Sequence, residues 1–166
     1  KRSILMIRKT FLNPQLMACA LIAALMLPVV ILTYTEHNPF WVALSALLLP
    51  LGFYTILAAL SRRSGVMTWW AFPFIFFSAF QVVLSYLFGN SVVAADMFLN
   101  LTTTNTGEAG ELLANIYPSV IAVFVIYLPL LYLATQHIIS KVSLGDRMRR
   151  RMIIGGAATM LAGCIT

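Results

Sequence analysis

Asp96, Asn100, Thr104 and Glu108 follow one another at intervals of four residues, and their types could do chemistry together. A helix through all four would carry them as one polar stripe that drifts by about 40° per step. The stripe offers carboxylates, an amide and a hydroxyl but no cation. It therefore suits an ammonium group or a zwitterion better than a bare phosphate, which carboxylates repel.

A structural interpretation of the same residues is also open. Asp96 and Asn100 fit the hydrated face of a surface helix. The run from Asn105 to Glu108 fits a helix start, with Asn105 as N-cap and Glu108 at the third helical position. Residue chemistry alone does not decide between a ligand site and a helix cap.

The composition indicates the kind of element that positions these residues. Apolar residues make up 61% of the 166-residue chain and charged residues only 10%, whereas a soluble domain has about 25% charged residues. Soluble, disordered and coiled-coil chains are excluded, and a polytopic membrane protein is expected. The net charge of +6 is then explained by membrane topology, and no nucleic-acid partner is expected.

Five apolar runs are expected to be transmembrane helices in one all-α domain, residues 1–166. They cover residues 16–35, 40–60, 66–88, 117–139 and 152–166. The first four contain no Asp, Glu, Lys or Arg and reach the length of about 20 residues that spans a bilayer. The fifth is shorter, so the natural chain is expected to continue beyond Thr166. Four prolines inside the runs are expected to bend them: Pro28, Pro50, Pro73 and Pro129.

The charged loops predict the orientation of these spans. All eleven Lys and Arg residues lie in segments 1–15, 61–65 and 140–151, whereas loops 36–39 and 89–116 contain none. By the positive-inside rule the N-terminus is cytoplasmic and loop 89–116 lies outside. This outer loop is expected to form an amphipathic helix over about 92–101, a break at 102–107 and a second short helix over about 108–115.

Other chemistry is sparse in this sequence. Cys19 and Cys164 lie in apolar runs, and His37 and His137 are expected on opposite sides of the membrane. No cluster has the spacing of a metal site. We therefore expect neither a catalytic residue nor a metal ligand in this chain.

The loop residues resemble those of a known family. The run from Asp96 to Asn100, the pair Thr104-Asn105 and the following Glu108 are similar to the periplasmic loop of the bacterial phosphoethanolamine transferases that modify lipid A, including the colistin-resistance members. The resemblance implies that Asn100, Thr104 and Glu108 bind the donor lipid. Thr103 departs from the family's pattern, in which an acid often precedes the Thr-Asn pair, and this leaves the subfamily open.

The resemblance also implies the rest of the protein. It implies five transmembrane helices in the bacterial inner membrane and, after residue 166, a soluble periplasmic catalytic domain of the alkaline-phosphatase and sulfatase type with a nucleophilic threonine and zinc. The donor would be phosphatidylethanolamine and the acceptor lipid A or a related glycolipid, a lipopolysaccharide modification linked to polymyxin resistance. Residues 1–166 alone are expected to be inactive.

An alternative from another class is a non-enzymatic membrane protein, such as a transporter half or an assembly subunit. Against it, His137 is the only ionisable residue of the Asp, Glu, Lys, Arg and His types in the first four spans. Translocation pathways generally need polar groups inside the membrane. The acceptor, whether lipid A, a core sugar or a glucan, stays open.

Overall fold

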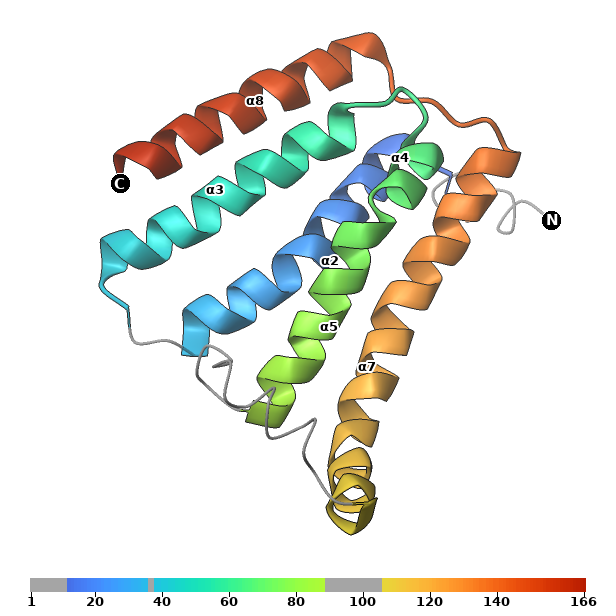
Figure 1. Ribbon diagram of the computed structural model, residues 1–166. Coiled ribbons are helices and arrows are strands. Elements are labelled where there is room, and N and C mark those ends of the chain that lie inside the picture. Colours follow the sequence, from blue (N-terminus) through green and yellow to red (C-terminus); the bar gives the residue numbers. More distant parts are fainter. Residues whose placement is uncertain (1–11, 36–37, 89–105) are drawn as a thin grey trace, which may run out of the picture.

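The computed structural model describes residues 12–35, 38–88 and 106–166, and side chains over 12–35, 38–85 and 117–166. All regular secondary structure in these residues is helical, which confirms the all-α prediction. The predicted surface helix at 92–101 lies outside the described residues. The helices are α2 (Pro14–Thr35), α3 (Phe40–Ala59), α4 (Ser64–Trp70), α5 (Phe72–Phe88), α7 (Thr106–Ile139) and α8 (Asp146–Ile165) (Figure 1).

Three helices are long and apolar enough to cross a membrane: α2, α3 and the Tyr117–Ile139 part of α7. The pair Ser64–Trp70 and Phe72–Ser85 passes the same test together, as one span bent by 60°. The described residues thus hold three such helices, or four if the bent pair is one span, which is consistent with a membrane protein.

The bend expected from Pro73 in the span at 66–88 is confirmed, and it is sharp enough to divide the span at Ala71 into α4 and α5. This residue has φ −78° and ψ 2°, so the chain leaves the α conformation between α4 and α5. Pro73 explains the break, because it has no N–H and its ring clashes with the helical carbonyl of Trp69 four residues earlier. The other three prolines predicted to bend spans, Pro28, Pro50 and Pro129, lie inside single helices.

The predicted short helix at 108–115 and the predicted span at 117–139 are one helix. α7 has 34 residues, so it is about 51 Å long at 1.5 Å per residue. A bilayer measures about 40–45 Å with its interfacial regions. Pro118 lies inside α7 without ending it. The Thr106 end of α7 therefore extends past the other helices (Figure 1).

α8 begins earlier than predicted, at Asp146 and not near Met152. Its first turns carry the basic run 147–151, which makes α8 too charged to count among the candidate spans. Asp146 favours this start, because an acidic side chain interacts well with the positive end of the helix dipole. The predicted fifth span at 152–166 is therefore only the apolar part of a longer, amphiphilic helix.

Glycines hold α8 tightly against α3, and the two helices run antiparallel (Figure 1). A Cβ atom added at Gly52 would lie 2.6 Å from the carbonyl oxygen of Gly156, and one at Gly163 would lie 3.0 Å from the backbone nitrogen of Leu49. Such small residues let helix backbones approach closely in membranes. Gly52, Gly156 and Gly163 thus allow close packing of α3 and α8, whereas Gly155 faces open space.

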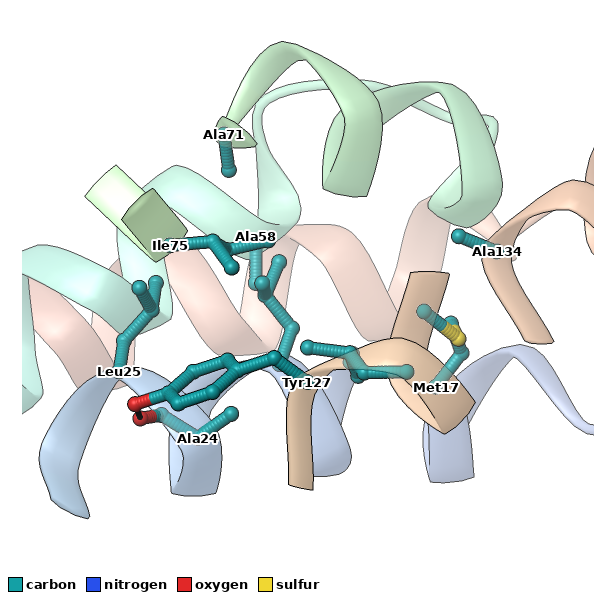
Figure 2. Close-up of a cluster of buried hydrophobic side chains, with 11 residues drawn as sticks. Met17, Ala24, Leu25, Ala58, Ala71, Ile75, Tyr127 and Ala134 are labelled. Carbon is teal, nitrogen blue, oxygen red and sulfur yellow. Dashed lines mark hydrogen bonds between the residues drawn. The ribbon is translucent and has the colours of Figure 1, made fainter. Parts of the chain in front are cut away.

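The main core lies between α2, α3, α5 and α7 (Figure 2). Met17 and Leu25 of α2 are fully buried there and pack with Ile75 of α5 and Tyr127 of α7. Small residues such as Ala58 and Ala134 let the helices come close. This core fixes α5 beside α7, which matters for the site described below.

The two ends of the helical assembly differ in charge. The ends of α3 and α7 and the starts of α2, α4 and α8 lie together at one end (Figure 1). Every cation that the structure describes is at this cationic end: Arg62, Arg63, Lys141, Arg147, Arg149, Arg150 and Arg151. The opposite end holds the starts of α3 and α7 and the ends of α5 and α8, and no Lys or Arg in its described part.

Candidate functional site

The structure places the predicted donor-site residues only in part. Asn100 and Thr104 lie outside the described residues. Glu108 is the third residue of α7, which begins at Thr106, although its side chain is outside the described part. This helix start puts Asn105 directly before the first helical residue. The spacing of a capping box is thus met, and both interpretations of Glu108 remain.

The structure describes the two helices on either side of the predicted site. α5 ends at Phe88 and α7 starts at Thr106, so the chain between them joins these two helices at the end opposite the cations. The order of the two helices in the sequence already implied that this segment connects them. The structure adds that α5 and α7 are neighbours packed in the same core.

A lipophilic groove of about 360 Å³ lies between α5 and α7. Along α5 it is lined by Phe76, Phe80 and Val83, and along α7 by Val120 and Phe124. All of these side chains are apolar, so the groove can take hydrocarbon but no charged group. We call this the α5/α7 groove.

Aromatic rings form the outer wall of the α5/α7 groove. The rings of Phe76 and Phe80 stack with a centroid distance of 6.5 Å and an interplanar angle of 3°. Phe76 is 55% exposed and its neighbour Phe77 is 66% exposed. Exposed rings at such a density would be costly in water but are suited to a hydrocarbon surrounding. The wall therefore faces the region where lipid chains lie.

A buried polar cluster lies beside the groove. Tyr127 Oη donates to the carbonyl oxygen of Ala24 at 3.0 Å, and Ser78 Oγ donates to the same oxygen at 3.3 Å. The two hydroxyls are 2.9 Å apart. The tyrosine reaches across the core toward Ala24 in Figure 2. Three helices, α2, α5 and α7, are thus connected through one carbonyl oxygen.

Pro28 explains why this carbonyl needs partners. In a regular helix the Ala24 carbonyl accepts from the N–H of residue 28, and proline has none. An unpaired backbone carbonyl inside a membrane costs several kcal/mol by order of magnitude. Tyr127 and Ser78 supply the missing donors. Sequence analysis did not find this cluster, although a proline, a serine and a tyrosine inside apolar runs were its signal.

The surroundings of His137 indicate a structural role in helix packing. It is 1% exposed, and its Nδ1 lies 3.0 Å from Ser64 Oγ. Gly65 allows this approach, because a Cβ there would collide with the carbonyl oxygen of Ala134. The pair joins α4 to the cationic end of α7. Among the described residues no three His, Cys, Asp or Glu side chains come together to hold a metal.

Comparisons with known proteins identify no relative: no family model, curated protein or solved structure matches this chain.

Proposed function

We propose that this chain is the membrane domain of a phosphoethanolamine transferase, which moves phosphoethanolamine from phosphatidylethanolamine to lipid A or a related envelope glycolipid. The observation that carries the proposal is the α5/α7 groove, an apolar slot between two helices: Asn100 and Thr104 fall between these helices in the chain, and Glu108 lies in the first turn of α7. A diacyl lipid needs such a pair of features, with hydrocarbon space below and polar groups above.

The length of α7 supports the position of the polar groups. α7 is about 6–11 Å longer than a bilayer with its interfacial regions. If its Ile139 end stays near the opposite interface, Glu108 reaches the outer head-group level. There its carboxylate accepts a charge-assisted hydrogen bond from the ammonium. Asn100 and Thr104 donate to the phosphate oxygens without adding charge.

The charge distribution supports the orientation. Lys and Arg accumulate on the cytoplasmic side of membrane proteins, so the cationic end is cytoplasmic and the start of α7 is periplasmic. α8 runs back toward the periplasmic end beside α3 (Figure 1). A catalytic domain connected after α8 would start on the side of the membrane that holds the donor head group. That domain would supply the nucleophilic threonine and zinc.

The test of the head-group site is Glu108→Gln in the whole protein, with Glu111→Gln as the matched control. Losing a hydrogen bond to a charged group costs about 1.5–3 kcal/mol. If the hydrogen bond stabilises the transition state, its loss lowers the rate of transfer about ten- to a hundredfold. The measurement is mass spectrometry of modified lipid A, with membrane levels of each variant quantified. Full activity of Glu108→Gln would show that Glu108 is only a helix cap, because Gln can also serve in a capping box.

The proposed binding of the donor's acyl chain is tested by a substitution that fills the α5/α7 groove. Val83→Trp puts an indole where the acyl chain would lie and should lower transfer at limiting phosphatidylethanolamine. Val42→Trp is the control, because Val42 is 50% exposed on α3 and away from the groove. Equal transfer by Val83→Trp and the unmodified protein at limiting donor would refute this use of the groove.

The alternative of a non-enzymatic transporter half or assembly subunit has no observation in its favour in the described residues. The intramembrane polar groups that the structure describes in the core pair with backbone or with each other, as Tyr127 and Ser78 do.

A further inference from the structure

A second groove, larger than the first, lies between α2 and α7 and is open to the membrane. Its volume is about 710 Å³, within the usual range of small-molecule sites. Three alanines of α2 line it, and their short side chains leave space beside the helix: Ala20, Ala23 and Ala24. On the α7 side its apolar wall includes Ile126 and Leu130. We call it the α2/α7 groove.

The polar lining of the α2/α7 groove is confined to one stripe of α7. Tyr132, Gln136 and Ser140 follow one another at intervals of four residues and all line the groove. Residues four apart lie on the same helix face. The stripe ends at Ser140, at the cationic end of the helices. The groove is therefore apolar in its deep part and polar only toward its cationic mouth.

The groove is somewhat longer than the hydrocarbon part of one leaflet. The lining on the α7 side runs from Ile126 to Ser140, the residue directly after α7, and this covers about 21 Å at 1.5 Å per residue. One leaflet contributes about 15 Å of hydrocarbon. The groove thus extends from the middle of the bilayer past the hydrocarbon boundary, where head groups begin.

The charge at the mouth indicates the head group. Lys141 follows Ser140 directly, is exposed, and lies two residues beyond the end of α7 in the left-handed conformation with φ 52°. The other described cations lie at the same end of the helices, although none of them is among the residues that line the groove. Basic pockets between membrane helices bind anionic lipid head groups. A zwitterionic lipid would gain less from this field.

We propose that the α2/α7 groove binds one phospholipid with an anionic head group, from the leaflet on the cationic side. Its acyl chain lies against the alanines of α2, and its head group lies at Gln136, Ser140 and Lys141. This lipid is distinct from the proposed donor, which would enter from the opposite leaflet between α5 and α7.

Native mass spectrometry tests the proposal on the chain reconstituted in vesicles of equal phosphatidylglycerol and phosphatidylethanolamine and then extracted in mild detergent. We expect one retained phosphatidylglycerol per chain. Ala23→Phe, which fills the groove, should abolish this retention. Ala46→Phe is the control, because Ala46 is exposed on α3 and does not line the groove. Equal retention by the Ala23→Phe variant, or equal retention of the two lipids, overturns the proposal.

Two further measurements separate the components of the site. Lys141→Gln should weaken phosphatidylglycerol retention about fivefold, since a basic residue near an anionic membrane surface contributes about 1 kcal/mol; Arg150→Gln on α8 should not. A photoreactive amino acid at Ala23 should cross-link to phosphatidylglycerol that is present in the vesicles. A cross-link to a second copy of the chain, or to residues 1–11, in place of lipid would show a different occupant and refute the assignment.

Discussion

Tyr127→Phe should destabilise the helical assembly more when Pro28 is present than when it is replaced by alanine. Pro28 removes the donor that the Ala24 carbonyl would have in a regular helix, and the hydroxyl of Tyr127 replaces it at 3.0 Å. Hydrogen bonds between membrane helices contribute about 0.6 kcal/mol on average and up to about 1.7 kcal/mol. Because Ser78 still donates to the same oxygen at 3.3 Å, we expect the lower part of this range for Tyr127→Phe alone.

Removing both donors should be more costly than either change suggests. In Tyr127→Phe with Ser78→Ala the Ala24 carbonyl is buried without a partner, which costs about 1–3 kcal/mol. The assay is reversible unfolding of the chain in mixed micelles with increasing SDS. Tyr132→Phe is the control on the same helix, because Tyr132 is 68% exposed and outside the cluster.

The decisive comparison is a double-mutant cycle with Pro28→Ala. Alanine restores an N–H at position 28, so the Ala24 carbonyl regains its helical partner. The cost of Tyr127→Phe should then fall by at least half, and the difference is the coupling energy between Pro28 and Tyr127. An equal cost of Tyr127→Phe in both backgrounds would refute the explanation that the tyrosine compensates for the proline.

Three further predictions concern the packing and orientation of the helices. Gly156→Leu should lower the thermal stability of the chain strongly, because the side chain would meet Gly52 and Ile56 of α3, whereas Gly155→Leu has open space and should change stability by less than about 0.5 kcal/mol. Arg149→Met should cost about 1.5–3 kcal/mol, because its guanidinium donates to the carbonyl oxygens that end α3 at 3.0 and 3.1 Å; an unfolding titration that shows no loss would contradict this. With both native cysteines replaced, a single cysteine at Asn38 should react with an impermeant thiol reagent on intact cells and one at Ser143 should not; the reverse pattern would invert the orientation.

The sequence predicted the helices whose positions depend on apolar length. The predicted spans 16–35 and 40–60 agree with α2 and α3 to within about two residues. This success has a simple cause, since about 20 apolar residues without charge have few alternatives to a membrane helix. The bend at Pro73 was predicted, but the complete break at Ala71 was not, because proline composition alone does not say which of four prolines interrupts its helix.

Helix ends in polar segments were harder to predict. The start of α7 at Thr106 and that of α8 at Asp146 lie in stretches without apolar periodicity, where capping and tertiary contacts decide. Arg149 illustrates this, because its bonds to the end of α3 fix the first turns of α8 across about 90 residues of sequence. The partners of Pro28 and the two grooves depend on how helices pack, which composition does not specify.

The glycine contact between α3 and α8 has a consequence for synthesis in the cell. α8 emerges from the ribosome on the order of 100 residues after α3, which takes about 5–20 s at 5–20 residues per second. Throughout this interval α3 can pair with α2, but its surface around Gly52 lacks the helix that fits it. Nascent chains that stop before α8 would therefore present this surface to lipid, to the insertion machinery or to quality-control proteases. The packing of α3 is therefore complete only once α8 has been made, although α3 precedes α8 by about 100 residues.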